Sequence, residues 1–192
     1  MSIKWILPPP EGEPLFDRVA YADAPRFIKR AYGPHRDLFR QRHDCQFVWD
    51  YSNRAFVVTS FAGSTSDLAS GMHFIPRRVA SRAQHNNWLD IGAHIHDQGH
   101  LGTARMPGIC LGMPQARAWD RLMFDLWQDR YERNPRAGRL RGWWQDGLPR
   151  RKCWGVRAAS PVLWRPDYDN LMSEWITVCD LGETTQVEVL RA

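Results

Sequence analysis

The centre of this chain reads Gly92-Ala93-His94-Ile95-His96-Asp97-Gln98-Gly99-His100-Leu101-Gly102, where three histidines and one aspartate stand among small residues. If residues 87–101 form a helix, successive side chains are about 100° apart around its axis, and His96, Asp97 and His100 share one arc of its surface. The glycines in the same stretch let another backbone or a ligand come close. The sequence therefore predicts a central helix with a polar site on one face.

A hairpin and a second helix are predicted on either side of the central helix. Upstream, residues 46–51 and 55–61 are rich in β-branched and aromatic residues and are separated by the turn-forming segment 52–54. Downstream, Pro114 fits the first turn of a long helix that runs to about Tyr131. Its predicted apolar stripe consists of Trp119, Leu122, Met123, Leu126 and Trp127.

The remaining segments complete the predicted fold. Residues 1–14 are rich in proline and are expected to form an extended arm, and residues 37–42 are interpreted as a short helix. Residues 131–192 form a basic, Trp-rich C-terminal extension, in which we expect short strands at 162–164, 175–178 and 186–190. We therefore predict one α+β domain over 1–192, with a small antiparallel sheet packed against two central helices and extended arms at both ends.

The charge and composition of the chain indicate which kinds of molecule it could bind. The chain of 192 residues has a net charge of +5, and only three of its 26 basic residues are lysine. Arg130 to Lys152 interleaves arginines with Trp143 and Trp144, a combination that can bind phosphates and stack on bases. Such a run is more often a solvated loop or a protein contact, so nucleic acid is the least favoured partner.

The cysteines and the hydropathy of the chain indicate the cellular compartment in which it is made. The four cysteines are far apart and form no Cys-x-x-Cys pair, which favours reduced thiols and synthesis in a cytoplasm. The apolar run at the N-terminus is too short for a signal peptide, and no apolar run reaches the length of a membrane span. We expect no membrane span and no export signal.

Short motifs follow one another in a fixed order between residues 46 and 130. The hairpin is followed by Ser66-Asp67-Leu68-Ala69-Ser70, Pro76-Arg77, Ala93 with His96-Asp97, and Ala118-Trp119-Asp120-Arg121-Leu122. This order resembles an uncharacterised family of phage and prophage proteins, which typically show Thr-Asp-Phe-Ala-Ser-x-Pro-Arg, Ala-x-x-His-Asp-x-Leu-Tyr and Ala-Asp-x-x-Phe. Residues 71–75 are inserted relative to that pattern, and Gln98-Gly99-His100 replaces x-Leu-Tyr.

The resemblance implies a bacteriophage virion protein, made in the host cytoplasm, and assembled with neighbouring virion proteins in the tail region. The positions that match the family's polar residues are His96, Asp97, Asp67 and Asp120, and we predict these as catalytic residues. A histidine oriented by a carboxylate can act as a general base on water, so we expect a hydrolase directed at a cell-wall polymer such as peptidoglycan. The alternative is a non-catalytic structural adaptor of the tail or baseplate, in which the same residues form an internal hydrogen-bond network.

The spacing of His96 and His100 also suggests a metal site. His96-Asp97-Gln98-Gly99-His100 is a variant of the His-Glu-x-x-His helix, in which histidines at i and i+4 share one zinc ion. His94, Asp67 or Asp120 would have to supply the third ligand, and the predicted set is His96, His100 and Asp67 with zinc or another divalent metal. The alternative is that His94 and His100 are local surface or interface residues.

Overall fold

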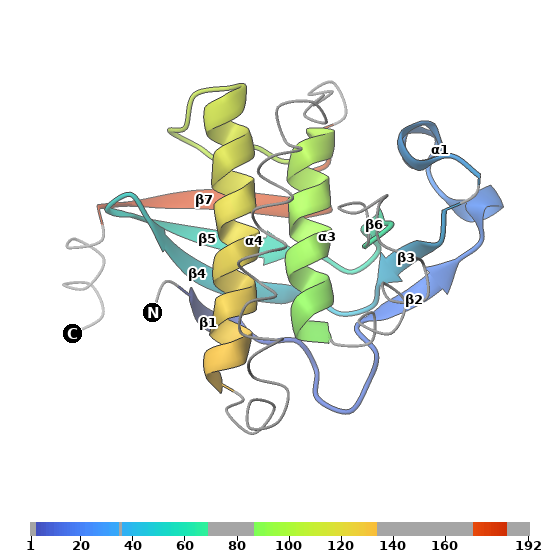
Figure 1. Ribbon diagram of the computed structural model, residues 1–192, viewed down its shortest axis with the longest axis horizontal. Helices are drawn as coiled ribbons and strands as arrows, with labels where there is room; N and C mark the ends of the chain where they lie inside the picture. Colours follow the sequence, from blue (N-terminus) through green and yellow to red (C-terminus); the bar gives the residue numbers. More distant parts are fainter. Residues whose placement is uncertain (1–2, 35, 69–86, 134–170, 184–192) are drawn as a thin grey trace, which may run out of the picture.

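The computed structural model describes residues 3–34, 36–68, 87–133 and 171–183. Two antiparallel sheets and several helices make up this part of the chain, which confirms the predicted α+β class. The larger sheet lies behind two long, nearly parallel rods, helices α3 and α4, and the smaller sheet lies beside them (Figure 1).

The larger sheet has the strand order β1-β4-β5-β7. The predicted hairpin forms its centre: β4 (Cys45–Tyr51) pairs with β5 (Arg54–Ser60), and both turn residues between them have positive φ, as tight hairpin turns require. β7 (Ile176–Glu183) pairs with β5, and β1 (Ile3–Leu7) pairs with β4. The N-terminal segment is therefore in part a sheet strand, and not only an extended arm.

The smaller sheet was not predicted. It consists of β2 (Phe16–Val19), β3 (Leu38–Gln41) and β6 (Thr65–Ser66) in the order β2-β3-β6. The short helix predicted at 37–42 is wrong, because residues 38–41 of this segment form β3, which pairs on one side with β2 and on the other with β6. The 3-10 helix η1 (Tyr21–Asp23) and the helix α1 (Arg26–Tyr32) connect β2 to β3.

Helices α3 (Asn87–Leu101) and α4 (Met113–Arg133) match the two predicted helices closely. Every member of the predicted apolar stripe of α4 is buried, and the main core contains apolar residues of these helices and of the larger sheet. Indole N–H groups also tie the sheet to α4: Trp5 Nε1 donates to Asp129 and Trp49 Nε1 donates to Asp125, each over 2.9 Å. Apolar burial and buried polar contacts together fix α4 on the sheet.

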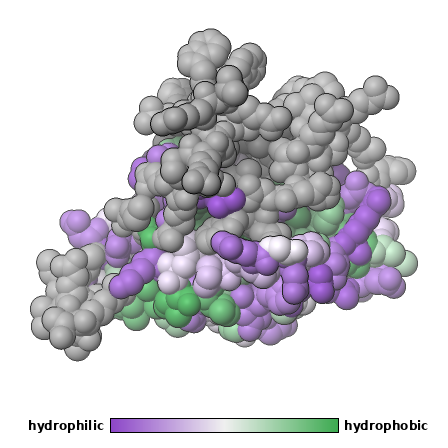
Figure 2. Space-filling view, turned by 90° about the horizontal axis from the view of Figure 1, so that it is seen from below, coloured by the Kyte–Doolittle hydropathy of each residue, from purple (hydrophilic) through white to green (hydrophobic). Residues whose placement is uncertain are grey.

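The C-terminal predictions are partly covered by the structure. The strand expected at 175–178 falls at the start of β7, whereas the segments 162–164 and 186–190 lie outside the described residues. Polar residues cover much of the described surface in the view from below, and apolar residues are visible at its lower left and at its right (Figure 2). Among the residues that the structure describes, no helix has the length and hydropathy that a membrane crossing requires.

Candidate functional site

The site lies where α3 and α4 approach each other closely. A Cβ atom on Gly99 would lie 2.2 Å from Trp119 Cδ2, so only glycine lets the neighbouring indole pack directly on the backbone of α3. Trp119 is followed by Asp120, whose carboxylate is thereby brought to the last turn of α3. Gly102 follows α3 with a φ of 81°, a left-handed conformation common at helix C-termini, and this last turn carries His100.

Asp120 bridges the two histidines that the sequence places one turn apart. Its Oδ1 is 2.9 Å from His96 Nε2 and 3.2 Å from His100 Nε2, and the centroids of the two imidazole rings are 4.0 Å apart. The Asp120 side chain is 1% exposed, and those of His96 and His100 are 10% and 13% exposed. We call these three residues the His/Asp centre.

The charges in the His/Asp centre are strongly coupled. Burial lowers the pKa of His96, but its hydrogen bonds to Asp120 and Asp97 and their charges outweigh burial and raise the pKa to about 9. Burial raises the pKa of Asp120, but the two imidazoles outweigh it and hold the pKa far below its usual range. Burial and the neighbouring His96 lower the pKa of His100 despite the opposing effect of Asp120. At neutral pH the metal-free centre therefore contains an imidazolium, a carboxylate and a neutral imidazole.

The geometry also suits a divalent cation. One ligand atom from each of His96, His100 and Asp120 can be chosen so that all three lie within 4.8 Å of one another. Two imidazole nitrogens and a carboxylate oxygen are ligands that zinc and other first-row divalent metals accept. The cluster differs from the predicted ligand set in one residue, because Asp120 takes the place of Asp67.

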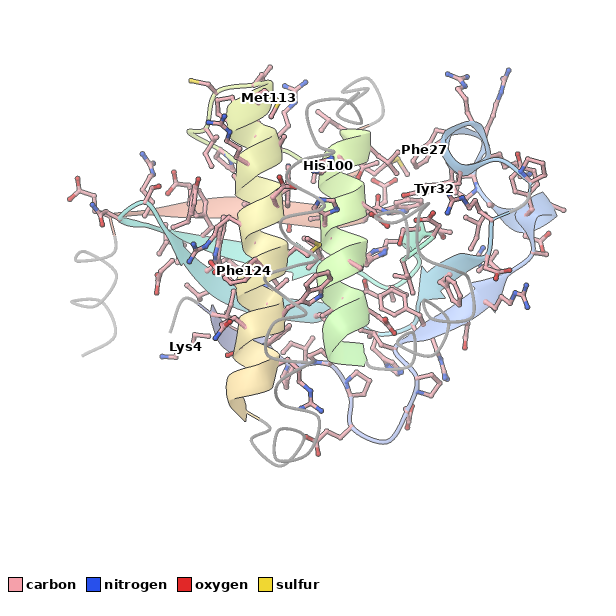
Figure 3. All side chains as sticks on the ribbon, viewed as in Figure 1. Lys4, Phe27, Tyr32, His100, Met113 and Phe124 are labelled. Atoms are coloured by element: carbon pink, nitrogen blue, oxygen red, sulfur yellow. The ribbon has the colours of Figure 1, made fainter. Side chains whose placement is uncertain are left out.

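Asp97 and Asp67 lie outside the His/Asp centre and have different neighbours. Asp97 Oδ1 is 3.6 Å from His96 Nδ1, whereas Asp67 Oδ2 is 3.7 Å from Arg36 Nη1. Both carboxylates act on Tyr32, whose pKa is raised well above its ordinary value by burial first and then by the charges of Asp97 and Asp67. His100 and Tyr32 lie on opposite flanks of α3 (Figure 3). Of the four predicted catalytic residues, the structure thus brings three together directly, and Asp67 lies with Tyr32 and Arg36.

His94 does not belong to the His/Asp centre, and it is not a surface residue. It is completely buried and lies between Ser64 Oγ, 2.8 Å from its Nε2, and Ser66 Oγ, 2.8 Å from its Nδ1. Burial lowers its pKa to about 4, so the ring is neutral at neutral pH. His94 therefore links α3 to the loop and short strand at β6, and this role excludes it as the third metal ligand.

Sequence reasoning missed Tyr32, Arg36 and the two serines around His94. Ser66 opens the Asp67 motif and Ser64 lies two residues before it, but a serine in a Gly/Ser/Thr loop gives no sign that it contacts a buried histidine. Tyr32 and Arg36 lie in a segment without periodicity, and only the folded chain brings them to Asp67.

We found no matching protein family, no similar curated protein and no similar solved structure for this chain.

Proposed function

We propose that this chain is a phage or prophage virion-associated protein of the tail region, and that its His/Asp centre is a metal-dependent hydrolytic site directed at the cell wall. The observation that carries the hydrolytic part is the convergence of His96, His100 and Asp120 within 4.8 Å. The phage context is supported by the order of the sequence motifs between residues 46 and 130.

The residues around the centre fit a metal site of this kind. His96 and His100 would bind the ion through Nε2, and Asp120 would bind it through a carboxylate oxygen. Asp97 faces the other ring nitrogen of His96, the position from which a carboxylate commonly orients a metal-binding imidazole. A divalent metal with three protein ligands and an open position supplies acidification of bound water and polarisation of a substrate carbonyl.

The test measures metal and activity on the same protein samples. Purified wild type is expected to bind about one zinc or other divalent ion per chain and to clear peptidoglycan in a zymogram. His96→Gln and Asp120→Asn are expected to lose both properties. His43→Gln is the matched control, because the His43 side chain is 42% exposed and pairs with Glu13 in another part of the chain. Metal binding by Asp120→Asn equal to wild type, or clearing that a chelator leaves unchanged, would contradict the proposal.

Burial of the centre favours a second candidate, the structural adaptor. Asp120 is 1% exposed and accepts hydrogen bonds from both histidines, an arrangement that can hold α3 and α4 together without reacting. In that case His96→Gln lowers the melting temperature while wild type binds no metal and clears no peptidoglycan. Loss of activity in a variant that keeps the wild-type melting temperature favours the hydrolase instead.

A further inference from the structure

A second candidate site lies on the larger sheet's side of α4. A pocket of about 390 Å³ opens between α4 and the β4–β5 turn. It is lined by Asp50, Tyr51, Ser52, Arg117, Arg121 and Asp125. None of these residues belongs to the His/Asp centre.

Two guanidinium groups give this pocket its chemistry. Arg121 Nε is 2.8 Å from Asp125 Oδ1, and Asp125 is in turn fixed by the buried Trp49, whose Nε1 donates to its other oxygen. This contact uses Nε, and the two terminal nitrogens of Arg121 form no hydrogen bond or ion pair with any residue that the structure describes, so a ligand can use them. Arg117 lies one helical turn earlier, is exposed, and forms no ion pair with any residue that the structure describes.

The rest of the lining is aromatic and polar. The Tyr51 ring is stacked on Trp49, with ring centroids 4.6 Å apart and an angle of 13° between the planes, so its position is fixed. The exposed Asp50 and Ser52 stand on either side of Tyr51 in the chain and supply oxygen atoms that accept hydrogen bonds. A flat ring beside paired arginines and hydroxyl partners suits a ligand with a ring, hydroxyl groups and a carboxylate.

We infer that this pocket binds an acidic sugar, with the carboxylate held by Arg117 and Arg121 and the sugar ring against Tyr51. Arginine pairs bind carboxylates through charge-assisted hydrogen bonds, and sugar hydroxyls are satisfied by carboxylate and serine oxygens. The choice of a cell-wall sugar rests on the proposed function. The pocket then binds glycan whose acidic sugar carries a free carboxylate, through residues that do not belong to the His/Asp centre.

The test is a titration with N-acetylmuramic acid, followed by calorimetry or by NMR of the tryptophan indole resonances. Wild type is expected to bind this sugar with a dissociation constant on the order of 1 mM, and to bind N-acetylglucosamine, which lacks the carboxylate, at least about tenfold more weakly. Arg117→Ala is expected to weaken binding roughly tenfold to a hundredfold, and Arg121→Lys by a similar factor, since lysine cannot form the bidentate contact. Arg40→Ala removes an exposed arginine from the smaller sheet and is expected to bind like wild type.

Three outcomes would overturn the inference: equal affinity for the two sugars, equal binding by Arg117→Ala and wild type, or tighter binding of inorganic phosphate than of the acidic sugar. Binding is measured without turnover, so it can be repeated on His96→Gln. If the chain binds the sugar but binds no metal and clears no peptidoglycan, the result supports the acidic-sugar pocket and contradicts only the hydrolase. Clearing without sugar binding counts against the pocket alone.

Discussion

Gly99→Ala is the most informative single change in the helix pair. The added Cβ atom would lie 2.2, 2.4 and 2.5 Å from three atoms of the Trp119 indole, distances that real side chains essentially never show. Trp119 is 0% exposed, so the ring has no solvent to move into. The helices must separate or the indole must leave its position, and either change moves the adjacent Asp120 away from His96 and His100.

The expected magnitude combines two opposing effects. Alanine in place of glycine favours the helix by about 1 kcal/mol, while overpacking a filled core costs about 1–3 kcal/mol and occasionally more. Because the new Cβ atom lies 2.2 Å from a rigid buried ring, the overpacking cost is expected to be about 3 kcal/mol. The helix gain of about 1 kcal/mol offsets part of this cost, so Gly99→Ala is expected to lower the free energy of unfolding by about 2 kcal/mol. Gly92→Ala is the matched control. Its Cβ atom would lie 2.8 Å from Trp127 Nε1, the edge of a ring that is 8% exposed, and its net effect is expected to stay within about 1 kcal/mol.

Urea unfolding followed by tryptophan fluorescence measures both variants under the same conditions. Gly99→Ala is also expected to bind zinc more weakly than Gly92→Ala, because only residue 99 packs beside the residue that precedes Asp120. An unfolding midpoint for Gly99→Ala at or above that of wild type would refute the reasoning. Equal zinc affinities in the two glycine variants would show that the close helix approach does not set the geometry of the His/Asp centre.

Three further predictions concern groups outside the centre. Burial, and then Asp44, raise the pKa of the Cys45 thiol to about 12, so iodoacetamide at pH 8 is expected to leave Cys45 unmodified in the native chain, as peptide mass mapping would show. The same reagent is expected to modify two exposed cysteines, Cys110 and Cys179. The pKa of His94 is about 4 in the folded chain and about 6.5 when unfolded. As the pH falls from 6.5 toward 4, the unfolded chain therefore binds a proton at His94 that the folded chain does not, and the free energy of unfolding falls. Between pH 7 and pH 4, metal-free wild type is therefore expected to lose about 3 kcal/mol more unfolding free energy than His94→Gln, and equal losses in urea titrations would contradict this. Asp125→Ala removes the acceptor of the buried Trp49 indole and is expected to lower the free energy of unfolding by about 1–3 kcal/mol, whereas an unchanged urea midpoint would show that another acceptor replaces it.

The elements that sequence reasoning found are those with a strong local signal. The helix predicted over 87–101 is Asn87–Leu101, and the helix predicted from Pro114 to about Tyr131 is Met113–Arg133. Helical periodicity and a proline in the first turn are properties of neighbouring residues, so they survive in any tertiary context that buries the apolar stripe. The hairpin was found for the same reason, because a short turn between two β-rich runs is a local feature.

The elements that were missed depend on partners far away in the chain. β3 carries no clear alternation and becomes a strand because β2 and β6 pair with its two edges. The motif order predicts Asp67 beside His96, but Arg36 and Tyr32 lie beside Asp67 in the folded chain. Conversely, the sequence offers Asp120 as one of three possible third metal ligands, and only the close approach of α3 and α4 at Gly99 brings Asp120, and not Asp67, to the two histidines.

The hydrolase and the adaptor differ in what a divalent metal does to stability. In the metal-free chain a proton occupies His96 Nε2 beside Asp120, and a bound ion must replace it, since both use the same lone pair. An ion that binds only the folded chain raises the free energy of unfolding by about 2.7 kcal/mol at a concentration one hundred times its Kd. If the His/Asp centre binds a metal, zinc is therefore expected to raise the urea midpoint of wild type and of His43→Gln, but not of Asp120→Asn. A purely structural network predicts no rise, because it does not bind the ion. This titration needs no substrate, so it separates the two functions even before the cell-wall polymer is identified.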